Sequence, residues 1–237
     1  MNTKLTSIFL GLCLSLIVSS ACWSQPQNFV AVYTAQLKQA DGQLSMTLKK
    51  EDGGLYSYEL TTKPGGFWRI IIDGSIWQKS TFILEGNDVL RSQTYELIDT
   101  IRSKPRKSRA SFDWEDSLIT GHYKDRAIKL PFTGNIIDKV SLQIAIIMDI
   151  KRGIDQSEYH ILDKDKIQVV QVNRNSSAMI NVPFGKFEAI EINRSSPDSN
   201  RTNTLWLAPE LDYIPVKITQ EENGKIVFSA SLSQLTH

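Results

Sequence analysis

The chain has 237 residues, of which 27 are Lys or Arg and 26 are Asp or Glu, so its formal net charge is only +1. Binding to nucleic acid needs an excess of basic residues, and this balance excludes nucleic acid as a general partner. The two cysteines, Cys13 and Cys22, lie in or beside the N-terminal leader. The rest of the chain therefore has no disulfide framework and no thiolate metal site, and it must fold by burial of apolar surface.

The N-terminus has the layout of a cleavable export signal. Lys4 supplies a positive charge, an apolar run extends from Leu5 to Val18, and small residues follow it. We expect residues 1–24 to be the signal peptide, with cleavage after Ala21 or after Ser24. Export of this kind takes the mature protein to an oxidising compartment.

A second interpretation of the same end is a lipoprotein. Ser19-Ser20-Ala21-Cys22 resembles a lipobox, which would put a diacyl anchor on Cys22. After the leader, no stretch is long and apolar enough to cross a bilayer as a helix, so we expect no transmembrane segment in the mature chain. Without a linker or a composition break, residues 25–237 are expected to form a single β-rich domain.

Strands with alternating apolar and polar residues dominate this domain. Asp-Gly and Asn-Gly turn signals separate them, at the spacing of about 8 to 12 residues that is typical of antiparallel proteins. The pattern predicts an antiparallel meander and not a parallel sheet with crossover helices. Two runs illustrate the alternation: Tyr56, Tyr58 and Leu60, and Ile226, Phe228, Ala230 and Leu232.

One segment has helical periodicity instead. It predicts a single apolar helix near residues 137–151, with Asp138 or Asn135 as the N-cap. We expect this helix to pack against a strongly curved antiparallel sheet, a half-barrel or barrel-like meander, so that the fold class is mainly β. The helical spacing is carried by Ile137, Val140, Ile144, Ile147 and Met148.

The clearest local pattern in the chain extends from Leu205 to Ile218. Two apolar β-type runs flank a turn at Pro209 to Asp212, and Pro215 comes where the second strand begins, a position that tolerates a missing N–H. Trp206 and Tyr213 could form a stacking platform for a sugar or base. We interpret them instead as parts of the wall of two adjacent strands.

No motif for catalysis, a cofactor or a metal occurs. A serine nucleophile signature, a phosphate-binding loop and His-Glu-x-x-His are all missing from the sequence. An enzyme would have to use His122 and His160 with nearby carboxylates, and these histidines are far apart in the sequence. We therefore assign no catalytic, cofactor-binding or metal residue, name no ligand-binding residue, and expect a protein that is not an enzyme.

Charged residues form three short runs. Arg102 to Arg109 is basic and could contact an anionic head group, but we interpret it as an exposed loop or edge strand that faces solvent. The acidic runs Asp113 to Asp116 and Asp163 to Asp165 are predicted to be solvated hairpin ends.

Six blocks occur in a characteristic order: Lys79-Ser80-Thr81-Phe82, Leu90-Arg91-Ser92-Gln93-Thr94-Tyr95, Ser111-Phe112-Asp113-Trp114, Asp138-Lys139-Val140-Ser141-Leu142, Val182-Pro183-Phe184-Gly185-Lys186-Phe187, and Trp206 to Ile218. Together they resemble the bacterial domain of unknown function 3108 family, whose members are exported and uncharacterised. The resemblance covers essentially the whole mature chain. It implies a fold similar to the curved-sheet lipid and lipoprotein carriers of the periplasm, and no catalytic residues. One departure is Gln78, where the family pattern has an acidic residue.

These observations favour a non-enzymatic periplasmic protein that binds an apolar or amphipathic, lipid-like ligand in the hollow of a curved sheet. No cofactor is expected. If the helix fills the hollow completely, no ligand enters. The alternative function is a structural or interaction module that docks on another cell-envelope protein through an exposed edge strand.

Overall fold

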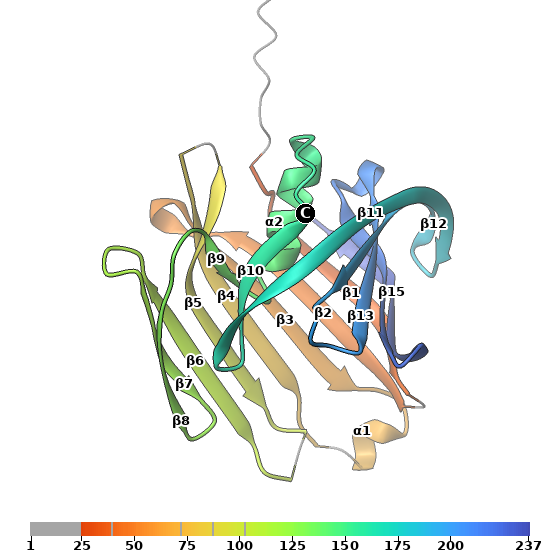
Figure 1. Cartoon of the computed structure of the whole chain (residues 1–237). Helices are drawn as coiled ribbons and strands as arrows, with labels where there is room; N and C mark the ends of the chain where they lie inside the picture. Colours follow the sequence, from red (N-terminus) through yellow and green to blue (C-terminus); the bar gives the residue numbers. More distant parts are fainter. Residues whose placement is uncertain (1–24, 39, 72, 87, 102) are drawn as a thin grey trace, which may run out of the picture.

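The computed structural model describes residues 25–237 except 39, 72, 87 and 102 (Figure 1). The expected signal peptide and Cys22 lie outside the described residues. The described chain is mainly β and forms a single sheet of 15 strands. The strands are β1 (Phe29–Leu37), β2 (Ala40–Lys50), β3 (Leu55–Pro64), β4 (Ile76–Glu85), β5 (Val89–Asp99), β6 (Arg106–Asp113), β7 (Leu118–Tyr123), β8 (Arg126–Pro131), β9 (Ile136–Asp138), β10 (Glu158–Asp163), β11 (Lys166–Val182), β12 (Gly185–Ser195), β13 (Arg201–Ala208), β14 (Ile214–Glu222) and β15 (Lys225–Thr236).

Two meanders make up the sheet. Strands β1 to β8 follow one another on one side, strands β15 back to β9 on the other, and the pairing of β1 with β15 joins them. The N-terminal and C-terminal strands of the domain are thus neighbours at the centre of the sheet. All described ladders are antiparallel except that between β9 and β10.

The prediction of a mainly β fold with a mostly antiparallel sheet is confirmed, but the predicted strong curvature is not. The sheet is open, because its order begins with β8 and ends with β9, and it is neither closed into a barrel nor strongly curled. The prediction that crossover helices are absent is wrong at one place. Strand β9, helix α2 (Leu142–Lys151) and β10 form a crossover unit, since two parallel neighbours cannot be joined by a tight hairpin.

Helix α2 begins five residues later than the sequence predicts. Residues 136–138 pair with His160 to Leu162 of β10, so their backbone groups are satisfied by the ladder and not by a helix. The N-cap position belongs to Ser141 rather than to Asp138 or Asn135. Apolar residues are required both in a buried strand and in a buried helix, which is why their spacing suggested one continuous helix.

The predicted packing of this helix against the sheet is confirmed. Leu142 to Asp149 are all buried, and side-chain hydrogen bonds join this segment to β3 of the first meander and to β10 of the second. Gln143 donates to the hydroxyl of Tyr58 on β3 (2.7 Å), while Lys151 pairs with Asp212 before β14 (2.5 Å). We call the face of the sheet that packs on α2 the inner face. Within the described part of the chain, no helix has the length and apolar character needed to cross a membrane.

A buried carboxylate fixes the first turn of α2. Asp138 is fully buried, and its Oδ2 accepts hydrogen bonds from the hydroxyls of Ser80 on β4 (2.6 Å), Ser92 on β5 (2.8 Å) and Ser141 (2.8 Å). Its Oδ1 accepts the backbone N–H groups of Val140 (2.8 Å) and Ser141 (3.0 Å). A buried charge is tolerated when it is hydrogen-bonded in this way. We refer to Ser80, Ser92, Asp138 and Ser141 as the Asp138 cluster.

This cluster explains why three separate sequence blocks accompany one another. The Ser-x-Phe block contributes Ser80, the strand block that ends in Tyr95 contributes Ser92, and the Asp-x-x-Ser-Leu block contributes Asp138 and Ser141. The residues are 46 to 58 positions apart across the strands, yet they share one carboxylate. Their common role is to attach β9 and the start of α2 to β4 and β5.

The prediction of two adjacent strands joined by a turn at Pro209 to Asp212 is confirmed, although Tyr213 is not part of a strand. Strands β13 and β14 are adjacent, and the 3-10 turn η2 (Pro209–Leu211) joins them. Trp206 is directly opposite Lys217, whose ammonium lies 4.9 Å from the centre of the indole ring. Tyr213 lies in the turn, with its backbone N–H bonded to the carbonyl of Ala208. The two aromatic residues do not form a stacked pair.

The charged runs are placed partly as predicted. The acidic runs lie at the β6–β7 and β10–β11 hairpin ends, and Asp113 accepts the backbone N–H groups of Glu115 and Asp116 there. The basic run is not an edge strand, because its second half lies in β6 between β5 and β7. Arg106 of this run pairs with the buried Asp99 at 3.0 Å.

Replacement of Asp138 tests the cluster. We expect Asp138→Ala to lower the free energy of unfolding by about 3 kcal/mol or more, because three hydroxyls and two backbone N–H groups lose their acceptor. Asp155→Ala is the matched control, since Asp155 is exposed. Urea unfolding of the two variants measures the difference. A loss below about 1 kcal/mol for Asp138→Ala would contradict the assignment.

Candidate functional site

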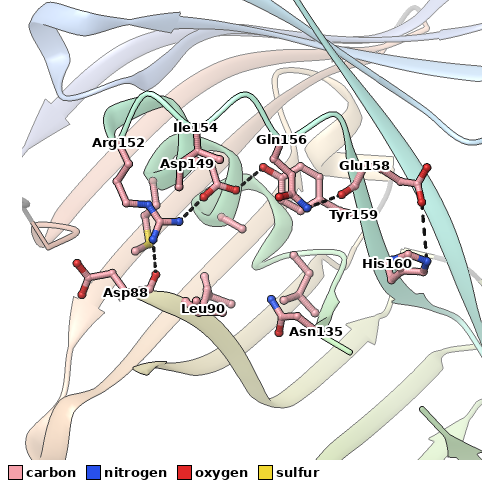
Figure 2. Close-up of a pocket in the computed structure, with 14 residues that line it drawn as sticks. Asp88, Leu90, Asn135, Asp149, Arg152, Ile154, Gln156, Glu158, Tyr159 and His160 are labelled. Atoms are coloured by element: carbon pink, nitrogen blue, oxygen red, sulfur yellow. Dashed lines mark hydrogen bonds and ion pairs between the residues drawn. The ribbon is translucent and has the colours of Figure 1, made fainter. Parts of the chain in front are cut away.

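A pocket of about 280 Å³ lies at the C-terminal end of α2 (Figure 2). The β4–β5 turn, β9, the last turn of α2 and the first residues of β10 surround it. Its floor is apolar and includes Leu90, Ile137 and Met148, and two exposed apolar residues, Val89 and Ile154, also line it. The pocket combines an apolar floor with several polar groups, as small-molecule sites do.

The charged groups of this pocket are occupied with one another. Asp149 accepts a hydrogen bond from the Tyr159 hydroxyl (2.6 Å) and forms an ion pair with Arg152. Arg152 also donates to the carbonyl of Asp88 (3.2 Å), as Figure 2 shows. Burial, followed by the hydrogen bond to Asp149, raises the pKa of Tyr159. A neutral tyrosine and a paired carboxylate are suited to holding α2 against β10, not to acid–base chemistry at neutral pH.

Beside α2, the space for a ligand is small. The pocket between the helix and β1, β2 and β14 has a volume of only about 20 Å³, roughly that of one water molecule. Ile144, Ile147 and Met148 are among its lining residues. The helix therefore fills this part of the inner face, in agreement with the expectation that it could exclude a ligand there.

On several strands, one inner-face side chain is buried and the next one on the same face, two positions along, is partly exposed. One set of inner-face residues is fully buried beside α2 and is called the covered row. The next set, away from α2, is only partly buried and is called the half-exposed row. The covered row is Tyr58, Ser80, Ile192, Leu205, Ile218 and Ala230, and the half-exposed row is Leu60, Gln78, Arg194, Asn203, Gln220 and Phe228.

Strand register divides the half-exposed row into two sets. Leu60 is directly opposite Gln78 across β3 and β4. Arg194, Asn203, Gln220 and Phe228 are successive neighbours across β12 to β15. Side chains directly opposite in antiparallel strands have Cβ atoms about 5 Å apart, so the members of each set are within contact distance.

Arg194 is unusual among these residues. Its Nε is fully buried without a hydrogen-bond partner, and no ion pair or hydrogen bond to its guanidinium occurs among the described residues. Burial lowers the pKa of Arg194 to about 10, with a smaller opposing contribution from Tyr58. Arg194 as a whole is only partly buried, but a cation with an Nε that is shielded from water and has no acceptor is costly for a folded protein. Its presence on the inner face therefore needs an explanation.

Tyr58 is hydrogen-bonded to the helix and interacts electrostatically with Arg194. Its hydroxyl accepts the amide N–H of Gln143 (2.7 Å) and donates to Sδ of Met46 (3.2 Å), a weak acceptor. Burial raises its pKa, and the positive charge of Arg194 opposes that rise. The phenol of this covered-row residue consequently stays neutral.

The residues considered from the sequence are placed apart. His122 lines a shallow hollow with Lys104 to Lys107, whereas His160 lines the pocket at the end of α2. In the described ranges, no group of three or more His, Cys, Asp or Glu residues could hold a metal ion. Gln78, which stands in place of an expected acid, accepts a hydrogen bond from the Tyr95 hydroxyl (3.2 Å).

Sequence reasoning did not identify Arg194. The sequence did contain an indication of it, because Ile190, Ile192 and Arg194 alternate at spacing two and so lie on the same face of β12. A cation at the third position of an apolar face marks either the end of the buried face or a charged site. Only the burial of its Nε distinguishes the two.

Comparison with known proteins agrees with this architecture. Residues 30–230 match the family described as protein of unknown function DUF3108. The fold is similar to a crystal structure described as a beta-barrel-like protein of domain of unknown function DUF1849 from Brucella abortus, with a TM-score of 0.57 and 12% sequence identity. The match covers 88% of this chain and 96% of that chain, and it shows the fold alone. No curated protein matches this sequence.

The buried tyrosines predict alkaline unfolding. Burial raises the pKa of Tyr33, Tyr58, Tyr95 and Tyr159, so the folded state keeps protons that the unfolded chain loses near pH 10. The stability that they contribute is fully present below about pH 10 and is lost as the pH rises above it. We expect a part of the phenolate absorbance to appear in the same steep step as the change in tryptophan fluorescence. Complete phenolate formation before that step would contradict the prediction, and a titration in urea provides the reference.

Proposed function

This chain belongs to the family described as protein of unknown function DUF3108, and we propose that it is an exported, periplasmic and non-enzymatic protein that binds an amphipathic molecule with an anionic head group. The N-terminal residue pattern supports the export. The observation that carries the binding proposal is the unpaired guanidinium of Arg194 on the inner face of the sheet. The ligand site is the half-exposed row, beyond the part of the inner face that α2 covers.

An anion at Arg194 removes the cost of the buried charge. Guanidinium groups bind carboxylates and phosphates through two parallel N–H···O bonds, and such bonds are stronger in a partly desolvated site than in water. Asn203 is directly opposite Arg194 on the neighbouring strand. The side-chain amide of Gln220 donates a hydrogen bond to Oδ1 of Asn203 at 3.0 Å. The side-chain amides of this row can donate further hydrogen bonds to head-group oxygens.

Apolar residues in the same row support an amphipathic ligand over a simple anion. Leu60 and Phe228 are partly buried and pack against the hydrophobic core, so one side of each remains available. Phe228 is two strands from Asn203 in the ladder, whereas Leu60 belongs to the separate set on β3 and β4. A ligand with its anionic group at Arg194 can therefore place an alkyl chain on apolar surface.

A non-enzymatic role is supported by the state of the titratable groups. Burial keeps the tyrosines of the inner face neutral, and the carboxylates of Asp138 and Asp149 are fully engaged by donors from the protein. His122 and His160 line different hollows. A binding role requires only Arg194 and the row beside it, without an activated nucleophile.

Arg194→Met separates ligand binding from structural support. We expect the affinity for dodecanoate to fall about tenfold or more, because one charge-assisted interaction is lost. Dodecyltrimethylammonium, with the same chain and the opposite charge, should not be preferred by the native protein. Lys186→Met is the matched control, since Lys186 is an exposed cation on the same strand. Calorimetric titration below the micellar concentration measures both ligands.

The same variant should become more stable without ligand. At neutral pH, Arg194 is charged in both the folded and the unfolded chain, and the burial that lowers its pKa destabilises the folded state. We expect Arg194→Met to raise the melting temperature of the ligand-free protein, whereas loss of a structural arginine would lower it. A lower melting temperature together with unchanged dodecanoate binding would overturn the proposal.

A further inference from the structure

Strand β11 has a long free edge. It extends over 17 residues, but β10 pairs only with its first part, from Lys166 to Gln171. Beyond the bond from the N–H of Val172 to the carbonyl of Ser157, the side of β11 that faces away from β12 has no backbone partner among the described residues. A bulge at residues 174–177 interrupts this edge, and residues 177–182 continue it without irregularity.

Charge and proline, two of the usual protections of an exposed edge, are missing from this run. Natural edge strands are commonly blocked by charges, by proline or by a covering segment. Residues 177–182 contain no charged residue and no proline, and Ser177, Ala178 and Met179 are exposed. Met179 is 57% exposed, which is unusual for a large apolar side chain.

The free edge is held in place by its own hairpin. At the β11–β12 turn, the N–H of Phe184 donates to the carbonyl of Leu232 on β15 (3.0 Å). The rings of Phe184 and Phe187 stack at 5.9 Å, and Asn175 donates to Glu191 across the hairpin (2.8 Å). A strand that is already ordered loses little conformational entropy when another strand is added to it.

We infer that this edge is a docking site for an extended segment of another protein, which adds to β11 as a further strand. Backbone hydrogen bonds along residues 177–182 supply affinity, and Met179 contacts an apolar side chain of the partner. The exposed Arg174, which lies before the run on the other side of the bulge, has no acidic partner among the described residues. The partner segment therefore carries a carboxylate near Arg174.

A second copy of this chain fits the edge less well. Residues 172–182 contain Arg174 and no Asp or Glu, so pairing two copies brings two cations and no carboxylate to the interface. A second copy would therefore leave each Arg174 without a carboxylate. The charge of the edge thus favours a different, acidic segment.

Photo-crosslinking in intact cells of the source organism tests the inference. Met179→p-benzoylphenylalanine should give one dominant adduct with another protein, whose crosslinked peptide is an extended segment with an acidic residue. The matched control is the same replacement at Ile226, which is 60% exposed on β15 and outside the edge. An adduct between two copies of this chain, or none above the control, overturns the inference.

Two further changes show whether the backbone edge and Arg174 act as stated. Adjacent N–H groups point alternately toward β12 and away from it, so one of Ser177→Pro and Ala178→Pro should keep the melting temperature and abolish the adduct. Arg174→Glu should reduce the adduct about two- to fivefold, while Lys186→Glu leaves it unchanged. An adduct that persists in the folded proline variant, or that is insensitive to Arg174→Glu, contradicts the inference. None of these outcomes depends on ligand binding at Arg194.

Discussion

The hydrogen bonding of the Asp138 carboxylate is the interaction on which the rest of the structure depends. An isolated buried carboxylate costs several kcal/mol, so the folded state is favourable only when its donors are all in place. Those donors come from β4, from β5 and from the first turn of α2. The helix, the parallel pair β9–β10 and the centre of the first meander must therefore assemble together. The position of α2 then determines which row of the inner face is covered.

Asp138 and Arg194 show two opposite solutions for a charge inside this sheet. Asp138 has five donors and a structural role, whereas Arg194 has no hydrogen-bonding or ion-pair partner among the described residues and a pKa that burial lowers to about 10. The donors around Asp138 compensate its buried charge, whereas no group in the described part of the chain compensates that of Arg194. We therefore assign Arg194 no role in stabilising the fold. The contrast makes Arg194 a better candidate for a ligand than the pocket at the end of α2, where the charges pair with one another.

The sequence was sufficient for those features that depend on local pattern. Alternation and turn residues predicted the β-rich sheet, and the Pro209 to Asp212 turn was assigned correctly because its signals lie within a few residues. The start of α2 was misplaced, because Ile136 and Ile137 are buried by pairing with β10, a contact between residues far apart in the chain. The Asp138 cluster and the isolation of Arg194 are also products of long-range packing. Serines and an aspartate in separate blocks do not reveal a shared carboxylate until the strands are ordered.

The edges of the sheet differ in how they are protected against pairing with a further strand. Strand β8 ends the first meander with exposed Arg126 and Lys129 and with Pro131, and Arg126 pairs with Asp165 (2.6 Å), features that discourage further pairing. Strand β9 is only three residues long, and the Asp138 cluster fixes it to β4 and β5. The free run of β11 has neither charge nor proline, although an unprotected edge favours aggregation. Because the same chain protects its other two edges, an open edge at β11 is most simply explained by a strand that occupies it.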